Sequence, residues 1–137
     1  MHVQEMIDRH PRLRGGGDDA LARAVEACFA CAQACVACAD ACLGEEAVAD
    51  LAECIRLNLD CADVCLTAGK TSTRRTGSNE MVVGAMLDAC AVACARCAEE
   101  CARHADRHDH CRLCAEACRI CEAACRQARA EVGSPLQ

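Results

Sequence analysis

The sequence predicts an all-α protein: an up-down-up-down antiparallel four-helix bundle that follows a short N-terminal extension. Three observations support this fold. The chain has 137 residues, which suits a single domain. Its 17 cysteines recur at steps of three and four residues, which is the period of one helix face. It contains only two prolines and eight glycines, and most of them lie between the segments that carry this period.

The N-terminal extension is expected to cover residues 1–17. Residues 2–10 suit a short helix, which Pro11 would end because proline does not continue a helix. Three consecutive glycines then predict a flexible break before the bundle. The bundle is expected to span residues 18–132, and residues 133–137 form a C-terminal tail that begins with Gly-Ser-Pro.

The first two long helices have recognisable start and stop signals. Asp18 is a suitable N-cap for a helix over residues 19–43, and Gly44 is expected to end it in the left-handed conformation. The second helix is expected over residues 45–68, with Gly69 as its end. Alanine is frequent in both segments and favours the helical state.

The third and fourth helices are predicted in the same way. Ser78 is a suitable cap for a helix that continues to about residue 104. A tight turn over residues 105–108 leads to the fourth helix, which Asp106 or Asp109 would cap. Connections this short place consecutive helices antiparallel, which gives the up-down-up-down order.

The cysteines define the face of each helix that points inward. Their steps of three and four are the a and d spacing of a heptad, and each set falls within an arc of about 60–80°. The second helix carries only three cysteines, and Asn58 occupies the position of a fourth. The stripes are Cys28, Cys31, Cys35, Cys38 and Cys42; Cys54, Cys61 and Cys65; Cys90, Cys94, Cys97 and Cys101; and Cys111, Cys114, Cys118, Cys121 and Cys125.

These stripes allow three interpretations. Cysteine can serve as a small core hydrophobe, but leucine packs such a seam better, and all 17 thiols lie on the seams. Disulfides along a helix are strained, because residues three or four apart have Cβ atoms about 5–6 Å apart and a disulfide needs about 3.5–4.5 Å. The odd number of cysteines also prevents complete pairing within one chain. Metal binding is the interpretation that the pattern favours.

Thiolates are soft ligands that select Cu(I), Zn(II) or Fe–S clusters. A ferredoxin-type cluster needs a loop pattern ending in Cys-Pro, which this sequence lacks. Zinc prefers four ligands, and straight stripes predict no discrete groups of four; four thiolates would also leave two negative charges at each buried zinc. Cu(I) accepts two or three thiolates, and one ion per thiolate leaves a neutral core. The sequence therefore predicts many Cu(I) ions, on the order of one per thiol.

Charge and composition argue against several other classes. The chain has 21 acidic residues against 15 Lys and Arg, which disfavours a nucleic-acid partner. The longest apolar stretch, residues 27–43, is interrupted by Gln33 and Asp40, so no membrane association is expected. The N-terminus lacks the apolar region of a secretory signal, and we expect a cytoplasmic protein with reduced thiols. No nucleophile–base pair or phosphate-binding loop is visible, so no enzyme activity is expected.

Cysteine stripes on all four helices of a bundle resemble the cytosolic copper storage protein family. The resemblance covers residues 18–132 and rests on the Cys-x2-Cys-x3-Cys-x2-Cys run, present over residues 28–38 and 111–121. It implies storage of Cu(I) in the core of a homotetramer of bundles, and no catalysis. Such a store would protect against copper toxicity and could supply copper enzymes. The alternatives are a zinc or Fe–S binding protein and a thiol redox protein.

One end of the bundle is expected to admit copper. There Cys42, Cys101 and Cys111 lie near the turn that holds His104 and His108, and imidazole is a copper ligand. We expect these two histidines to mark the mouth, the alternative being ordinary surface histidines near a helix terminus. At the opposite end the seams continue as an apolar plug of Leu21, Ala24, Ala68, Val83, Met86, Leu87 and Ala128.

Two polar side chains near the stripes need separate interpretations. His110 lies off the stripe of its helix and is expected to be solvated. Asn58 would lie in the core, where it could fix the register of the helices or lend its carbonyl oxygen to a metal. Because a hard oxygen is a poor ligand for Cu(I), the register role is favoured.

Overall fold

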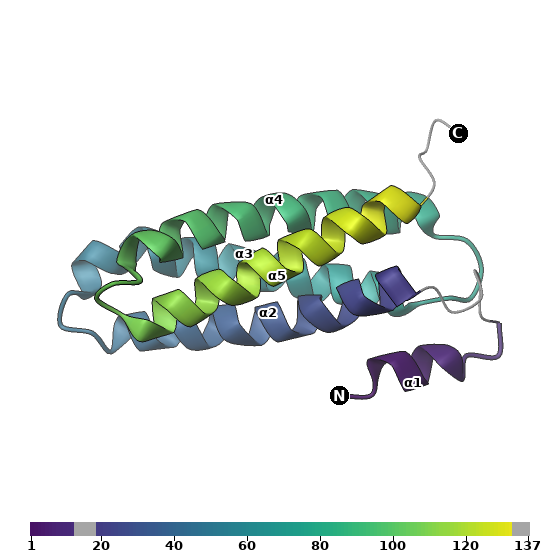
Figure 1. Ribbon diagram of the computed structural model, residues 1–137, viewed down its shortest axis with the longest axis horizontal. Coiled ribbons are helices and arrows are strands. Elements are labelled where there is room, and N and C mark those ends of the chain that lie inside the picture. The colour runs from purple at the N-terminus through teal and green to yellow at the C-terminus, as the bar shows by residue number, and fades with distance from the viewer. Residues whose placement is uncertain (13–18, 133–137) are drawn as a thin grey trace.

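The computed structural model describes residues 1–12 and 19–132 of the chain, and within these it contains helices only. Its four long helices form the bundle, with consecutive helices antiparallel (Figure 1). The Asp18 cap and the C-terminal tail lie outside the described residues. The elements are α1 (Val3–Asp8), α2 (Asp19–Leu43), the 3-10 helix η1 (Val48–Leu51), α3 (Ala52–Thr73), α4 (Glu80–His104) and α5 (Asp109–Glu131).

The four long helices close into a ring in which each packs against the next and α5 packs against α2. This arrangement confirms the predicted all-α, up-down-up-down bundle. The connection from α2 to α3 and the turn from α4 to α5 lie at one end of the bundle (Figure 1). The start of α2, the loop from α3 to α4 and the end of α5 lie at the other. The two ends are therefore built from different segments and differ in chemistry.

The core follows the cysteine stripes, and every cysteine side chain is buried. Alanines beside the stripes, such as Ala62, Ala91 and Ala98, are buried as well, and their small side chains let the helices approach closely. The predicted apolar plug forms where the stripes end. Its members Ala24, Ala68, Val83, Leu87 and Ala128 are buried, and Leu21 and Met86 are partly buried against the same cluster.

The connection between α2 and α3 differs from the prediction of a helix starting at residue 45. The N–H groups of Gly44 and Glu45 bond the carbonyls of Ala41 and Cys42, which tightens and closes α2. A turn and η1 follow, and they bring Leu51 into the core with 1% of its surface exposed. Gly44 does not adopt the predicted left-handed conformation, since Gly77 has the only positive φ among the described residues.

Gly69 was expected to end the second long helix, but α3 continues through it to Thr73. A Cβ atom at residue 69 would lie 3.1 Å from Cζ of Phe29, on the neighbouring α2. This glycine therefore permits a close contact between two helices and does not act as a stop signal. The chain leaves the helix only at Arg74, whose backbone is extended.

The predicted caps of the last two helices are also wrong in detail. Asn79 is the N-cap residue of α4, and the Ser78 hydroxyl instead donates to the Glu80 carboxylate at 2.6 Å. His108 is the N-cap residue of α5, and Asp109 is the first residue of that helix. The Asp109 carboxylate accepts a hydrogen bond from Arg112, one turn further on. Both helices therefore begin without a side-chain cap hydrogen bond.

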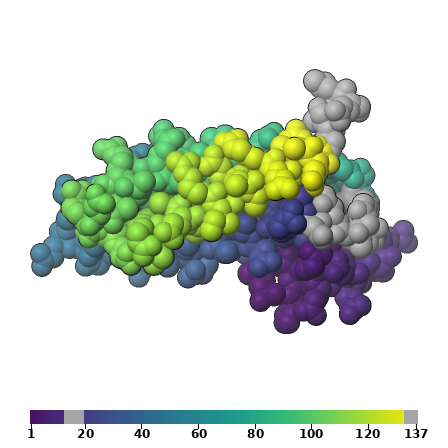
Figure 2. Space-filling view, viewed as in Figure 1, coloured from purple at the N-terminus to yellow at the C-terminus, as the bar shows by residue number. Residues whose placement is uncertain are grey.

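The short helix α1 packs on the outer face of α2, near the plug end of the bundle (Figure 2). It is shorter than the predicted span of residues 2–10. Val3 and Ile7 are buried against Ala22, Val25 and Phe29 of α2. Because a six-residue helix is not stable alone, this apolar contact with α2 is what holds it in place.

Two of the helices, α2 and α4, are long and apolar enough to cross a membrane by length and composition. Their cysteines and many of their alanines line the interior of the bundle. Burial in a bundle core accounts for the same apolar composition, because a core helix needs apolar residues on its inner face.

Candidate metal centre

The four cysteine stripes meet along the axis of the bundle and form one continuous column of thiols. All 17 cysteines are free, and their side chains are almost completely buried. Sulfur atoms from different helices lie close together: Cys65 and Cys90 are 3.4 Å apart, and Cys54 and Cys101 are 3.6 Å apart. These separations exceed the bonded S–S distance of about 2.05 Å but are near van der Waals contact.

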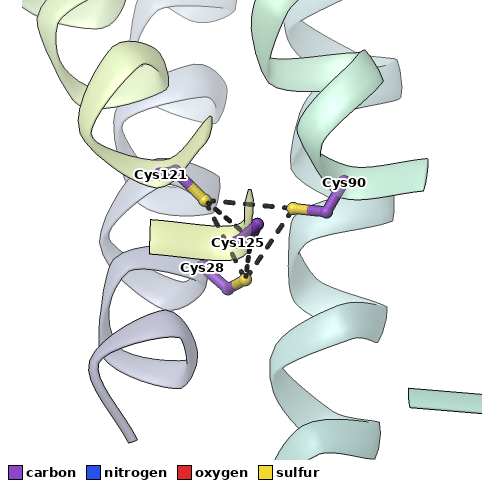
Figure 3. Close-up of side chains that lie close together, drawn as sticks. All are labelled: Cys28, Cys90, Cys121 and Cys125. Atoms are coloured by element: carbon purple, nitrogen blue, oxygen red, sulfur yellow. Dashed lines mark hydrogen bonds between the residues drawn. The ribbon is translucent and has the colours of Figure 1, made fainter. Parts of the chain in front are cut away.

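The thiols also gather in groups of four whose sulfur atoms all lie within 4.8 Å of one another. Figure 3 shows the group nearest the plug, in which side chains from α2, α4 and α5 point toward a common centre. Discrete groups of four were not expected from straight stripes, and the bundle forms them because neighbouring helices interdigitate. Five of these groups are Cys28, Cys90, Cys121 and Cys125; Cys31, Cys65, Cys94 and Cys121; Cys31, Cys35, Cys61 and Cys118; Cys35, Cys97, Cys114 and Cys118; and Cys38, Cys42, Cys54 and Cys111.

Four of these five groups are linked by shared members, whereas the group of Cys38, Cys42, Cys54 and Cys111 shares none with the other four. Cys121 and Cys31, for example, each belong to two groups. If a zinc ion held all four thiolates of one linked group, the neighbouring group would lack a ligand, and each filled site would bury two negative charges. A sulfur atom that bridges two monovalent ions satisfies both groups at once. The geometry therefore favours a chain of bridged ions such as Cu(I).

Burial also affects the charge of the two thiols at one end of the empty column. Desolvation raises the pKa of Cys42 to about 11, and the same cause raises the pKa of Cys111. These two thiols lie at the end of the column nearest the α4–α5 turn. At neutral pH they are therefore protonated and uncharged when no metal is present. An incoming cation must displace their protons.

Asn58 lies inside the column, at the position where a fourth cysteine of α3 would be. It is completely buried, and its Oδ1 accepts hydrogen bonds from three thiols, at 3.0 Å, 3.4 Å and 3.2 Å. Its Nδ2 donates to the Cys54 sulfur at 3.8 Å. The three donors are on α4 and α5, so one amide ties three helices together. They are Cys97, Cys101 and Cys114.

Replacing Asn58 with alanine is expected to destabilise the copper-free bundle by about 2–3 kcal/mol, through the cavity and the lost hydrogen bonds. Chemical unfolding of the reduced protein measures this change. The matched control is Gln33→Ala on the exposed face of α2, which should alter the free energy of unfolding by no more than about 0.5 kcal/mol. Equal effects of the two substitutions would show that the amide does not hold the helices in register.

The histidines predicted at the mouth lie at the expected end of the bundle. His104 is 8% exposed, and its Nε2 lies 2.7 Å from a carboxylate oxygen of Glu100, one turn earlier on α4. Its Nδ1 is buried and has no hydrogen-bond partner. His108, in the turn before α5, contacts the carboxylate of Glu45 through Nδ1. The structure thus places both side chains near the end of the thiol column.

His110, by contrast, is not solvated as the sequence suggested. Its Nδ1 lies 3.3 Å from the Cys38 sulfur and 3.6 Å from the Cys111 sulfur, and its side chain is 26% exposed. It is therefore the histidine with the closest contacts to the column. One signal was available in the sequence: His110 precedes Cys114 by four residues, so both lie on one side of the first turns of α5.

Comparison with known proteins gives a consistent result. Residues 18–130 match the family model described as copper storage protein. A copper storage protein from Streptomyces lividans, solved with 10 copper equivalents, is 53% identical; the match covers 93% of this chain and 98% of that one, with a TM-score of 0.90. A cytosolic copper storage protein from the same organism, solved with five coppers, is 56% identical over 84% of this chain and 96% of that one, with a TM-score of 0.82. The Cu(I)-bound storage protein BsCsp3 is 39% identical over 76% and 92% of the two chains, with a TM-score of 0.67.

Proposed function

Because this chain belongs to the copper storage protein family, we propose that it stores Cu(I) on the thiolates that line its bundle. The observation that carries the proposal is the continuous column of 17 buried, unpaired thiols. No packing requirement explains a core made of cysteine, because leucine would fill it better. A soft, monovalent cargo explains both the number of thiols and their continuity.

The spacing of the thiols suits two-coordinate Cu(I). If the Cu–S bond resembles the roughly 2.3 Å of Zn–S, a linear S–Cu–S unit spans about 4–5 Å. Interhelical sulfur pairs such as Cys31 and Cys94, at 4.0 Å, are close to this span before any metal enters. Small rotations of the side chains would complete the fit. The helices themselves need not move.

Charge balance supports the same cargo. A thiol releases its proton when it binds a metal, so each Cu(I) exchanges for one proton. The filled core then has the same net charge as the empty core, which avoids the large cost of burying uncompensated charge. A divalent ion on four thiolates does not meet this condition.

We assign the ligands as follows. All 17 cysteines hold copper, with Cys42, Cys101 and Cys111 as the first thiols inside the mouth. His104 and His108 are ligands of the entry region, and the contacts of His110 with two thiols add it to them. Asn58 acts through its hydrogen bonds and keeps the helices in register.

The wider biological role is part of this proposal. We infer a cytoplasmic homotetramer that performs no catalysis and binds neither nucleic acid nor membrane. The relative described as cytosolic supports the location, and the acidic net charge of −6 argues against a nucleic-acid partner. The homotetramer is what the family resemblance implies. The bundle sequesters Cu(I) that would otherwise be toxic, and its contents can supply copper enzymes.

An anaerobic Cu(I) titration of the fully reduced protein tests storage directly. With a chromophoric chelator present, we expect no signal until more than about ten equivalents have been added, as one ion per thiolate requires. Glutathione at the same total thiol concentration is the control and should release copper to the chelator earlier. A chelator signal after one or two equivalents would instead point to a zinc, Fe–S or thiol redox protein.

A further inference from the structure

A carboxylate joins the two histidines that lie nearest the open end of the column. Oε2 of Glu45 contacts Nδ1 of His108 and lies 3.4 Å from Nε2 of His110. Glu45 follows α2, and the histidines lie at the start of α5, so two distant segments meet at this end of the bundle (Figure 1). The side chains are partly accessible, at 33% for Glu45, 14% for His108 and 26% for His110.

These contacts favour one tautomer of each ring when the imidazole is neutral. An ionised carboxylate only accepts hydrogen bonds, so each nitrogen that faces it must donate. A neutral imidazole has one N–H, and its other nitrogen keeps a free lone pair. In a neutral His110 ring this arrangement favours the proton on Nε2, which leaves the Nδ1 lone pair facing the sulfurs of Cys38 and Cys111. In a neutral His108 ring the same contact favours the proton on Nδ1 and a lone pair on Nε2.

We propose that Glu45 is a positioning residue for copper entry, which sets the tautomers of His108 and His110 so that each ring offers one nitrogen to Cu(I). This inference rests on the proposed storage function. His108 keeps Nε2 for an ion while its Nδ1 contacts the carboxylate, and His110 presents Nδ1 to Cys38 and Cys111. Carboxylates that accept from the second nitrogen of a ligating histidine orient the ring and increase its basicity.

The opposite tautomer of His110 would work against loading. A proton on Nδ1 would point at the sulfurs of Cys38 and Cys111, and the lone pair would face the negative Glu45. The ring would then offer no ligand toward the column, and the next ligands would be the buried thiols themselves. Without Glu45 both tautomers of His110 become accessible. Only the tautomer with the proton on Nε2 offers a lone pair toward the thiols and can pass copper inward.

The experiment compares Glu45→Ala with Glu46→Ala. Both variants remove one negative charge from the same connection, and Glu46 is exposed, so the pair separates positioning from simple attraction of a cation. Stopped-flow mixing with a Cu(I) complex measures the rate at which the first equivalents load. We expect Glu45→Ala to slow this step by about tenfold, the size typical for loss of such a partner. Glu46→Ala should load at close to the wild-type rate.

Two further measurements make the outcome specific. Long-range proton–nitrogen NMR of the copper-free protein reports the tautomer of each histidine: we expect His110 protonated at Nε2 in the wild type and a mixture in Glu45→Ala. The total number of Cu(I) ions bound should be the same in both variants. Equal loading rates in Glu45→Ala and Glu46→Ala, or an Nδ1-protonated His110 in the wild type, would overturn the inference. Failure of the wild type to hold many ions would instead overturn the storage function.

Discussion

Filling the core with Cu(I) is expected to raise the thermal unfolding midpoint above about 90 °C, the range of hyperstable proteins. A ligand that binds only the folded state raises the free energy of unfolding by about 2.7 kcal/mol when its free concentration is 100 times its Kd. Ten such ions would raise the free energy of unfolding by about 27 kcal/mol. Each kcal/mol shifts the midpoint of a domain of this size by about 4 °C. Copper bound by thiols of the unfolded chain reduces the gain, but an unfolded chain does not offer the column of bridging sulfurs.

Anaerobic melts followed by circular dichroism measure this shift, with copper-free and fully loaded protein compared side by side. Removal of the copper with excess chelator should return the midpoint to the copper-free value, which separates bound metal from irreversible damage. The copper-free protein must also show a folded helical spectrum at the start. Its alanine-rich helices, its apolar plug and its neutral thiols pack without metal, unlike domains that fold only around zinc. A disordered spectrum before loading, or an unchanged midpoint after it, would contradict the expectation.

The sequence was most informative where a strong period determines the structure. The α2 helix has the predicted bounds, Asp19–Leu43, because its cysteines repeat without interruption up to Cys42. The burial of every cysteine also follows from the period, since residues three and four apart share one face. The same reasoning predicts that Asn58 lies in the core, where it is completely buried.

Local signals failed where contacts between helices decide the outcome. Glycine often follows the end of a helix, but α3 continues through Gly69, where a Cβ atom would lie only 3.1 Å from the ring of Phe29 on α2. His110 lies beside its stripe, and the contacts of its Nδ1 with Cys38 and Cys111 show that the ring turns inward. Periodicity specifies a face. Periodicity does not specify whether a side chain beside that face, such as His110, points into the core.

Thiols at the histidine end of the column are expected to control how fast copper loads. Replacement of Cys42 and Cys111 with alanine should lower the capacity by about two ions, on the basis of one ion per thiol. It should also slow loading by about tenfold, which corresponds to about 1.4 kcal/mol on the barrier. These two thiols belong to the group nearest the histidines, so every entering ion has to pass the gap that their loss creates. Removing only two sulfurs keeps the packing defect small, and a circular dichroism spectrum of the variant checks that it is folded.

The matched control removes Cys28 and Cys125, a pair 3.7 Å apart beside the apolar plug. The number of lost thiols is the same, so the capacity should fall equally. Loading of the first ions should keep its wild-type rate, because ions that enter at the histidine end reach this pair last. Equal slowing in both variants would mean that copper also enters through the plug, in which case the buried side chains of Val83 and Leu87 have to move aside during loading. The two pairs therefore distinguish a store with one mouth from a store that is open at both ends.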